Sequence, residues 1–373
     1  MMKITGAVLE EMGRARPYAK SQPISVGELE LEGPGPDEVL VKIEAAGVCH
    51  SDLSVVEGNR ERPLPILLGH EAAGVVIETG AEVTDLQPEQ RVVTVFLARC
   101  GECEHCATNG KLPCIPGTAA NNNGVLLNGV TRLSRGGETV QHHQGVSGFA
   151  THAVLNRRSV VPVDSDVPPA VAAVLGCAVL TGGGAVVNAG KPVEGQDVMI
   201  VGLGGVGMAA LLTAVSLAAA SERSGQIIGV DANPAKLTRA RELGATSVYS
   251  PQEIAEQGIK APVVIEAAGH PKAFEAAVEA TAAGGTTVTV GLPSPAARSS
   301  IAPLVITAEA RTIIGSYLGS AIPSQDIPAF AQMWREGRLP VEELVSAMIR
   351  LEDINQAMDD LADGKAVRQI ILF

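Results

Sequence analysis

Short apolar runs separated by turn residues fill the first third of the chain. Four of them, at residues 39–48, 71–80, 91–96 and 149–155, have the length and composition of β-strands. Short strands separated by turn signals favour antiparallel pairing. This part of the chain is therefore predicted to form an antiparallel, barrel-like body.

The pattern changes at residue 197, where strand-like and helix-like runs begin to alternate. Strand-like runs at 198–202 and 226–231 are followed by an Ala/Leu-rich run after Gly207 and by an amphipathic helical run at 234–244, and the alternation continues to residue 291. Such alternation predicts a parallel sheet with helices on both faces. The segments 121–129 and 291–300 have loop composition.

The tail repeats neither pattern. It has helix-like segments near 325–336 and 351–362 and a closing strand, VRQIILF, so we expect it to return to the first domain. A chain of 373 residues is long enough for two domains. We predict an α/β protein with a β-rich domain over residues 1–178, joined by residues 318–373, and a doubly wound parallel-sheet domain over residues 179–317.

Charge and composition restrict the partners. The net charge of −13 and pI near 5.1, without a Lys/Arg-rich run, argue against nucleic acid and anionic membranes and favour small-molecule substrates. Residues 197–220 are apolar enough to suggest a membrane span, but their glycines favour a buried strand, a turn and a buried helix. The charged N-terminus lacks a signal-peptide pattern, so we expect a cytoplasmic protein.

The sequence GLGGVG has the spacing G-x-G-x-x-G at Gly202, Gly204 and Gly207, and it stands between a strand-like and a helix-like run. This context predicts a dinucleotide site, in which Gly205 and Val206 belong to the phosphate-binding turn. Asp231, at the end of the next strand, is predicted to bind the adenosine ribose hydroxyls and to repel a 2′-phosphate, which favours NAD over NADP. Lys236 could also reach the ribose. The alternatives are a glycine turn in a nucleotide-free domain and, for the lysine, an ordinary helix surface.

Four of the six cysteines lie in one short run, RCGECEHCATNGKLPC, with the spacing C-x2-C-x2-C-x7-C. Four thiolates from one loop can close a tetrahedral structural zinc site with no open position. An iron–sulfur cluster and a set of unliganded thiols are the alternatives. The four residues are Cys100, Cys103, Cys106 and Cys114.

The two remaining cysteines, Cys49 and Cys177, stand in GVCHSDL and LGCAVLTGGG, and His70 stands between them in LLGHEAAG. Two thiolates and one imidazole would leave the fourth tetrahedral position open, as a catalytic zinc requires. Spacing alone does not establish this group, because a lone cysteine in an apolar run such as that around Cys177 is often a core residue.

Taken together, these motifs resemble the zinc-dependent alcohol dehydrogenases of the medium-chain dehydrogenase/reductase superfamily. The resemblance runs along the whole chain and includes GVCHSD, GHEAAG, the four-cysteine run, HHQGVSGFATHAV, GCAVLTG, GLGGVG, GVD and VRQIILF in the family's order. It implies a GroES-like catalytic domain and a Rossmann domain that binds NAD. It also implies two zinc ions per chain.

The resemblance implies that Cys49, His70 and Cys177 hold the catalytic zinc, and that the four-cysteine run holds the structural zinc. Glu71 corresponds to the acidic residue behind the catalytic metal. Asp52 corresponds to the carboxylate that orients the imidazole of His70.

The implied reaction is reversible hydride transfer from a zinc-bound alkoxide to the nicotinamide of NAD, which converts an alcohol to an aldehyde or ketone. Ser51 would receive the alcohol proton and pass it to the nicotinamide ribose. Well-known members carry a relay histidine three residues later, but this chain has Ser54. We therefore predict a relay through water or through another base.

Four further residues are assigned by the resemblance. His50 and Arg368 are expected against the cofactor pyrophosphate. Phe96 and Thr181 are expected in the substrate pocket, and Thr181 also near the nicotinamide. A surface position for His50 and a core position for Phe96 are the alternatives.

Only nine aromatic residues occur in the chain, three Tyr, five Phe and one Trp, so an aliphatic substrate channel is expected. A dehydrogenase for S-hydroxymethyl adducts of glutathione or mycothiol is the closest enzymatic alternative, since those relatives share both zinc motifs. An iron–sulfur electron-transfer protein and a non-catalytic nucleotide-binding or structural protein are the alternatives of another class. The strand RTIIGSYLG at 311–319 resembles the family segment that joins subunits, which predicts a homodimer or homotetramer.

Overall fold

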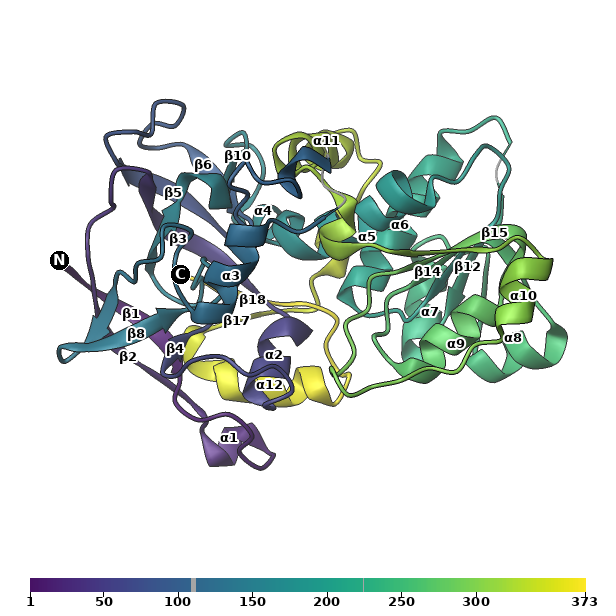
Figure 1. Ribbon diagram of the computed structural model, residues 1–373, viewed down its shortest axis with the longest axis horizontal. Helices are drawn as coiled ribbons and strands as arrows, with labels where there is room; N and C mark the ends of the chain where they lie inside the picture. Colours follow the sequence, from purple (N-terminus) through teal and green to yellow (C-terminus); the bar gives the residue numbers. More distant parts are fainter. Residues whose placement is uncertain (109–111, 224) are drawn as a thin grey trace. The chain divides into compact units, whose positions relative to one another are not determined.

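The structure is a computed structural model that describes residues 1–108, 112–223 and 225–373. The chain forms two compact units (Figure 1). Unit 1 consists of Met1–Cys177, Pro323–Ala331 and Val345–Phe373, and unit 2 consists of Ala178–Ile322 and Gln332–Leu344. The catalytic and cofactor-binding roles of the two domains stay predictions.

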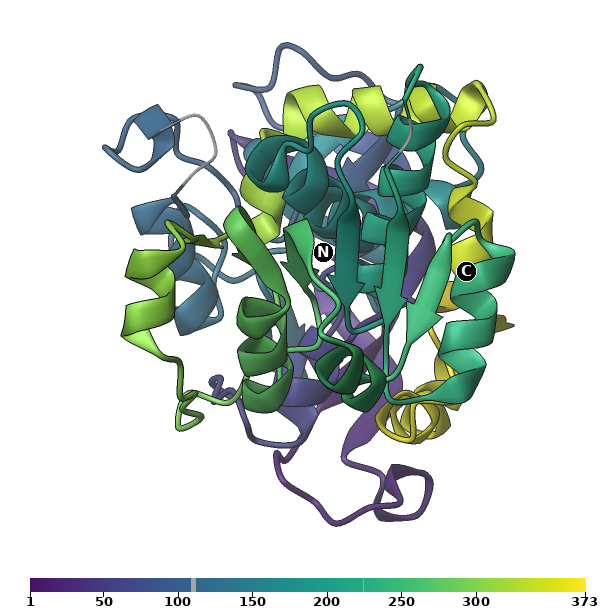
Figure 2. The same cartoon turned by 90° about the vertical axis from the view of Figure 1, so that its right-hand side faces the viewer.

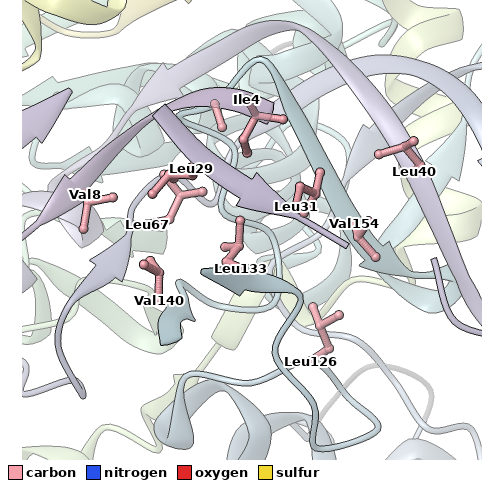
Figure 3. Close-up of a cluster of buried hydrophobic side chains, with 11 residues drawn as sticks. Ile4, Val8, Leu29, Leu31, Leu40, Leu67, Leu126, Leu133, Val140 and Val154 are labelled. Atoms are coloured by element: carbon pink, nitrogen blue, oxygen red, sulfur yellow. The ribbon is translucent and has the colours of Figure 1, made fainter. Parts of the chain in front are cut away.

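Unit 1 contains a closed five-stranded barrel. In spatial order its strands are β1 (Met2–Leu9), β2 (Ile24–Leu31), β7 (Leu133–Arg135), β8 (Glu138–His142) and β4 (Ile66–Leu67). Figure 3 shows side chains from these strands, among them Val8, Leu29, Leu67 and Leu133, gathered in one buried apolar cluster. Alternate residues of each strand supply this cluster because successive side chains of a strand point to opposite faces.

The second sheet of unit 1 contains all four strands that the sequence indicated. Its order is β10 (Val160–Pro162), β6 (Arg91–Thr94), β5 (Ala72–Thr79), β3 (Glu38–Val48), β18 (Gln369–Leu372) and β17 (Ala347–Ile349), and β9 (His152–Asn156) also pairs with β3. A barrel is present, but the predicted strands belong to this sheet, whereas the closed barrel is built from others. The predicted antiparallel pairing is wrong for β4 with β8 in the barrel and for β17 with β18 in this sheet, because both pairs are parallel. The last strand, β18, pairs antiparallel with β3, with Gln369 opposite Val48.

The helices of unit 1 are short. They are α1 (Tyr18–Ser21), α2 (His50–Val56), α3 (Ile115–Asn123), α4 (Pro169–Val174) and α12 (Ile354–Ala362), and α11 (Pro323–Arg335) continues into unit 2. The loop predicted at 121–129 is wrong for its first three residues, which belong to α3. A proline in the first turn starts this helix, and Gly124, with φ 68°, ends it in the left-handed conformation.

Unit 2 is a parallel α/β domain, as predicted. Its sheet has the order β13 (Ser247–Tyr249), β12 (Ile227–Val230), β11 (Val198–Val201), β14 (Ala261–Glu266), β15 (Thr281–Thr289) and β16 (Thr312–Gly315). All five pairings are parallel. Helices lie on both faces of the sheet (Figures 1 and 2), which explains why every residue of β11 and β12 is buried.

The helices of unit 2 follow the predicted alternation. They are α5 (Leu180–Gly184), α6 (Gly205–Ala219), α7 (Pro234–Glu242), α8 (Pro251–Gln257), α9 (Pro271–Glu279) and α10 (Pro303–Ala308). The strand predicted at 311–319 is shorter than expected. It ends at Gly315, because Leu318 and Gly319 adopt left-handed conformations in the turn Tyr317–Ser320.

Apolar segments of membrane-spanning length are buried. Residues 197–220 form the buried strand β11 and the mostly buried helix α6, as predicted. Among the described residues, one helical stretch, Pro169–Gly190, is long and apolar enough to cross a membrane, and 83% of its most apolar window is buried inside the protein. Burial of this kind is typical of the core helix of a folded domain.

Candidate active site

Three side chains from distant parts of the sequence meet inside unit 1. Cys49 lies between β3 and α2, His70 follows β4, and Cys177 lies in the helical turn Leu175–Val179. All three are buried, with Cys49 6%, His70 0% and Cys177 5% exposed. Their ligand atoms lie within 4.8 Å of one another. The structure thus brings together the group that spacing alone left open.

The distances within this group suit one tetrahedral metal ion. The Sγ atom of Cys177 lies 3.5 Å from Nε2 of His70. Ligands at typical Zn–S and Zn–N distances, separated by the tetrahedral angle, would lie about 3.5 Å apart. Two thiols and one imidazole therefore fit zinc with one position left for another ligand. We call these three residues the three-ligand group.

The two thiols of this group differ in acidity. A hydrogen bond with Cys177 lowers the pKa of the Cys49 thiol well below its usual value, and the same contact raises the pKa of Cys177. A divalent cation that bound both sulfur atoms as thiolates would replace this hydrogen bond.

Asp52 orients His70 from α2. Its Oδ1 atom lies 3.0 Å from Nδ1 of His70 and accepts from the backbone N–H of Gly69 at 3.2 Å, while Oδ2 accepts from the N–H of Cys49 at 3.2 Å. Burial alone would raise the pKa of Asp52, but the neighbouring imidazoles His70 and His143 outweigh it and lower the pKa to about 2. A carboxylate in this place keeps the proton of His70 on Nδ1 and leaves Nε2 facing the thiols.

Glu71 and Arg368 form a buried ion pair beside the three-ligand group. Nη1 of Arg368 lies 3.2 Å from Oε2 of Glu71 and also donates to the carbonyl of Val48 at 3.1 Å. Burial raises the pKa of Glu71 to about 7, against the opposing charge of Arg368. A carboxylate oxygen of Glu71 is within 4.8 Å of the three ligand atoms. The guanidinium predicted to bind pyrophosphate thus contacts Glu71 here, and its role toward a cofactor stays a prediction.

Helix α2 carries three further predicted residues. Its first residue, His50, is exposed, and Ser51 is half-buried next to it. The hydroxyl of Ser54 donates to the carbonyl of His50 at 2.8 Å, which is a common bond of a serine within a helix. The proposed proton transfer by Ser51, and any relay near Ser54, stay predictions.

Two rings stand edge-to-face against the imidazole of His70. The ring of Phe96 lies 5.4 Å from it, centroid to centroid, and the ring of His143 lies 5.7 Å from it at 90°. Phe96 was a predicted pocket residue, but His143 was not singled out. In the sequence, His143 is a polar residue within HHQGVSGFATHAV, and nothing in the sequence indicates that this residue is buried. Burial lowers the pKa of His143, which favours a neutral ring.

The four-cysteine run forms a second group in unit 1. The sulfur atoms of Cys100, Cys103, Cys106 and Cys114 lie within 4.8 Å of one another, and those of Cys100 and Cys106 are 3.9 Å apart. Four thiolates around one zinc ion would be about 3.8 Å apart. A multi-iron cluster would spread its thiolates over several iron atoms, so the observed spacing favours a single ion.

Backbone N–H groups point at these sulfur atoms. The N–H of Cys100 and that of Gly117 donate to Sγ of Cys114, at 3.2 and 3.4 Å, and the N–H of Cys103 donates to Sγ of Cys100 at 3.4 Å. A hydrogen bond from the backbone of Ile115 lowers the pKa of Cys103 to about 6. Such donors favour thiolates, the form in which cysteine binds metal, but burial outweighs them at Cys114 and raises its pKa to about 12.

In unit 2 the glycine-rich turn joins β11 to α6. Gly202 has φ +93°, and a Cβ on it would lie 2.6 Å from the backbone N of Ala268. A Cβ on Gly207 would lie 1.8 Å from the carbonyl oxygen of Gly202, whereas nothing lies within 4 Å of the same position on Gly204. The turn therefore needs glycine at both ends and has space at Gly204, where the backbone can approach a ligand.

Helix α6 starts at Gly205, so Gly205, Val206 and Gly207 form its first turn, where backbone N–H groups have no partner within the helix. Asp231 follows β12 beside this turn. Its Oδ2 accepts from the N–H of Leu203 at 2.8 Å, and Lys236 Nζ lies 3.9 Å from the same oxygen. Thr181 is buried in α5 of the same unit. The residues present fit a dinucleotide, with N–H groups for phosphate and a fixed carboxylate for ribose.

Comparisons with known proteins agree with this geometry. Residues 35–165 match the family described as alcohol dehydrogenase GroES-like domain, and residues 205–336 match the family described as zinc-binding dehydrogenase. A Mycobacterium tuberculosis protein, provisionally named alcohol dehydrogenase D, is 35% identical over the full length of both chains. An S-(hydroxymethyl)glutathione dehydrogenase from Synechocystis is 31% identical over 99% of this chain and all of its own.

A solved structure is similar over its full length as well. The crystal structure of benzyl alcohol dehydrogenase from Acinetobacter calcoaceticus matches with a TM-score of 0.89 and 30% identity, and each chain is covered completely. Membership of an oxidoreductase family argues against the two alternatives of another class, an iron–sulfur electron-transfer protein and a non-catalytic nucleotide-binding or structural protein. The chain belongs to the zinc-type alcohol dehydrogenases of the medium-chain dehydrogenase/reductase superfamily, which combine a GroES-like domain with a Rossmann-type domain.

Proposed function

We propose that this protein is a zinc- and NAD-dependent dehydrogenase that interconverts small alcohols with aldehydes or ketones. The observation that carries the proposal is the contrast between the two sulfur-containing groups. The three-ligand group provides one imidazole and two thiols, and its fourth tetrahedral position is left to Glu71, which is ion-paired with Arg368, or to a substrate oxygen, whereas the four-cysteine group is complete. Only the first therefore has room for a reacting oxygen.

The chain's own residues have defined tasks in this reaction. Zinc, when bound, supplies Lewis-acid chemistry for the substrate oxygen. Asp52 holds the His70 proton on Nδ1, so that Nε2 faces the ligand position. Ser51 would accept the alcohol proton, and Glu71 with Arg368 provides a buried charge pair next to the reacting centre. The glycine-rich turn, Asp231 and Lys236 would hold the phosphates and ribose of NAD, which supplies hydride-transfer chemistry when bound.

The substrate class is part of the proposal. Alcohols are proposed over thiol-adduct substrates because the sequence shows no cationic cluster placed for a charged thiol such as glutathione. The relatives named S-(hydroxymethyl)glutathione dehydrogenase favour the adduct as the second candidate.

A substrate panel tests both candidates. Purified protein with zinc would be assayed with aliphatic, benzylic and secondary alcohols and with S-(hydroxymethyl)glutathione, each with NAD and NADP. The proposal expects the highest kcat/KM with an alcohol and NAD. A higher kcat/KM for the glutathione adduct would replace the substrate class, and no oxidation of any alcohol by protein with two bound zinc ions would contradict the function.

Self-association is proposed through strand β16. Within the described part of the chain, this strand pairs with β15 on one side only and forms the end of the six-stranded sheet, and Thr312 and Gly315 are exposed. An unpaired strand edge can extend the sheet into a second copy. We propose a homodimer, alone or within a tetramer, in the cytoplasm. Light scattering that shows only monomer at micromolar concentration would contradict it.

A further inference from the structure

Arg158 is a charged side chain to which the proposed reaction assigns no role, and it contacts the loop of the four-cysteine group. It lies in the helical turn Arg157–Ser159, directly after β9. Its Nη1 atom donates to the carbonyl of Arg99 at 3.2 Å and also to the carbonyl of Cys100, which is 58 residues away in the sequence. One guanidinium therefore binds two consecutive peptide groups at the start of the loop.

The same two peptide groups direct their N–H ends at cysteine sulfur atoms. The N–H of Cys100, which shares a peptide group with the carbonyl of Arg99, donates to Sγ of Cys114 at 3.2 Å. The N–H of Gly101, which shares a peptide group with the carbonyl of Cys100, forms a hydrogen bond with the sulfur of Cys106. Each peptide group is thus bound at its oxygen by the guanidinium and at its nitrogen by a sulfur atom of the four-cysteine group.

The backbone of Arg158 is fixed, and the loop leaves space for its side chain. The N–H of Arg158 donates to the side-chain oxygen of Asn156 at 3.0 Å, and Asn156 is itself buried and donates to Asp37 at 2.5 Å. Gly101 has φ +82°, and a Cβ on it would meet Nη1 of Arg158. A side chain at position 101 would therefore compete with the guanidinium for the same space and would strain the left-handed backbone.

A chain of hydrogen bonds that begins at a cation strengthens the donors at its far end. A peptide group whose oxygen is bound by a guanidinium becomes a better donor at its nitrogen, because successive hydrogen bonds polarise one another. Four thiolates around one zinc ion leave the loaded group with a net charge of about −2, so stronger N–H donors and a nearby cation both stabilise it. Residues that support metal ligands in this way typically change metal affinity by about 10–100-fold.

We propose that Arg158 is a positioning residue for the structural zinc ion. Through the two peptide groups that it binds, Arg158 directs N–H donors at the thiolates of Cys106 and Cys114 and offsets the negative charge of the loaded group. The inference goes beyond the proposed function, because it concerns the four-cysteine group alone and does not depend on the substrate or on hydride transfer.

The rate of zinc release tests this role without an activity assay. The parent protein is the Cys49→Ala variant, in which the three-ligand group lacks a ligand, so that release of zinc to a chelating dye reports on the four-cysteine group. Arg158→Gln removes the charge and the guanidinium donors, and it should release zinc at least about tenfold faster than the parent. Arg158→Lys keeps the charge without the planar fork, so its release rate should lie between the two.

Arg157 provides a matched control in the same turn. It pairs with Asp85 at 2.7 Å and donates to the carbonyl of Val160 at 2.8 Å, so its partners lie outside the four-cysteine run. Arg157→Gln should therefore leave the rate of zinc release unchanged. An unchanged rate in Arg158→Gln, or an equal acceleration in Arg157→Gln, would overturn the proposal.

A second measurement reports on the sulfur atoms themselves. Cobalt(II) in place of zinc absorbs light through its bonds to thiolates, and hydrogen bonds at the sulfur atoms change the energy of that absorption. In cobalt-loaded protein of the same parent, Arg158→Gln should shift the thiolate-to-cobalt band, whereas Arg157→Gln should leave it in place. Faster metal release with an unchanged band would show that Arg158 only braces the loop, and would overturn its proposed action on the thiolates.

Discussion

At the scale of single residues, Asp231 combines a fixed orientation with a negative charge. Its two oxygens accept from the N–H groups of Leu203 and Asn233, at 2.8 and 2.9 Å, so the carboxylate ties the end of β12 to the glycine-rich turn. Its side chain is 13% exposed, and Lys236 lies at the edge of ion-pair distance. A carboxylate held in this way can accept from ribose hydroxyls and repels a 2′-phosphate.

Removal of this charge should therefore shift cofactor preference. Asp231→Asn keeps the size of the side chain, and we expect it to raise the ratio of kcat/KM with NADP to that with NAD at least about tenfold, mainly through the KM for NADP. Glu242→Gln, which removes an exposed carboxylate from α7, is the control and should leave the ratio unchanged. A wild type that uses both cofactors equally would contradict the role given to Asp231.

At the scale of elements, one buried carboxylate connects the ends of two strands in unit 2. Glu266, 1% exposed, ends β14, and its Oε1 accepts from the N–H groups of Ala268 and Gly269 at 2.9 and 2.8 Å. Its Oε2 accepts from the hydroxyl of Thr289, at the end of β15, at 2.7 Å. Because Gly202 packs against Ala268, Glu266 also supports the glycine-rich turn.

Truncation of the Glu266 side chain should destabilise the ends of β14 and β15 and the glycine-rich turn. Glu266→Ala leaves three donors unpaired, and we expect a loss of about 2–4 kcal/mol in the free energy of unfolding together with weaker binding of NAD. Glu266→Gln keeps an acceptor for the two N–H groups and should lose about 1 kcal/mol or less. Urea unfolding and NAD titration would measure both. Glu279→Ala, on the exposed side of α9, is the control, and a similar loss there would contradict the bracing role.

At the scale of the whole molecule, local pattern predicted the parts that depend on local chemistry. The alternation of unit 2, the turn at GLGGVG and the four closely spaced cysteines are all properties of short segments, and they appear where the sequence placed them. The three-ligand group depends on long-range topology, because Cys49 and Cys177 lie 128 residues apart (177 minus 49). Only the resemblance to a family joined them.

The sequence concealed other features for physical reasons. His143 looks like any loop histidine until the fold shows that it is buried beside Asp52 and His70. The contact between Arg368 and Glu71 arises because β18 pairs with β3, which no local pattern reveals. The strands of the closed barrel were not among those predicted, and two of them, β4 and β7, contain two and three residues, too few for a recognisable period.

The two metal-binding groups, both in unit 1, should fail in different ways when one ligand is removed. Cys103→Ala removes one ligand from the complete four-cysteine group, so we expect loss of one zinc per chain and a lower Tm, because binding to a structural site contributes to folding. Cys49→Ala removes a ligand from the open group, so we expect a folded protein with Tm close to the wild type but without measurable turnover. Metal analysis, thermal unfolding and kcat on the same preparations would distinguish them. Full turnover by Cys49→Ala would show that the three-ligand group is not needed for the reaction. Two zinc ions retained by Cys103→Ala would show that the four-cysteine group does not hold its own metal ion. Either result would contradict the division of roles between the two groups.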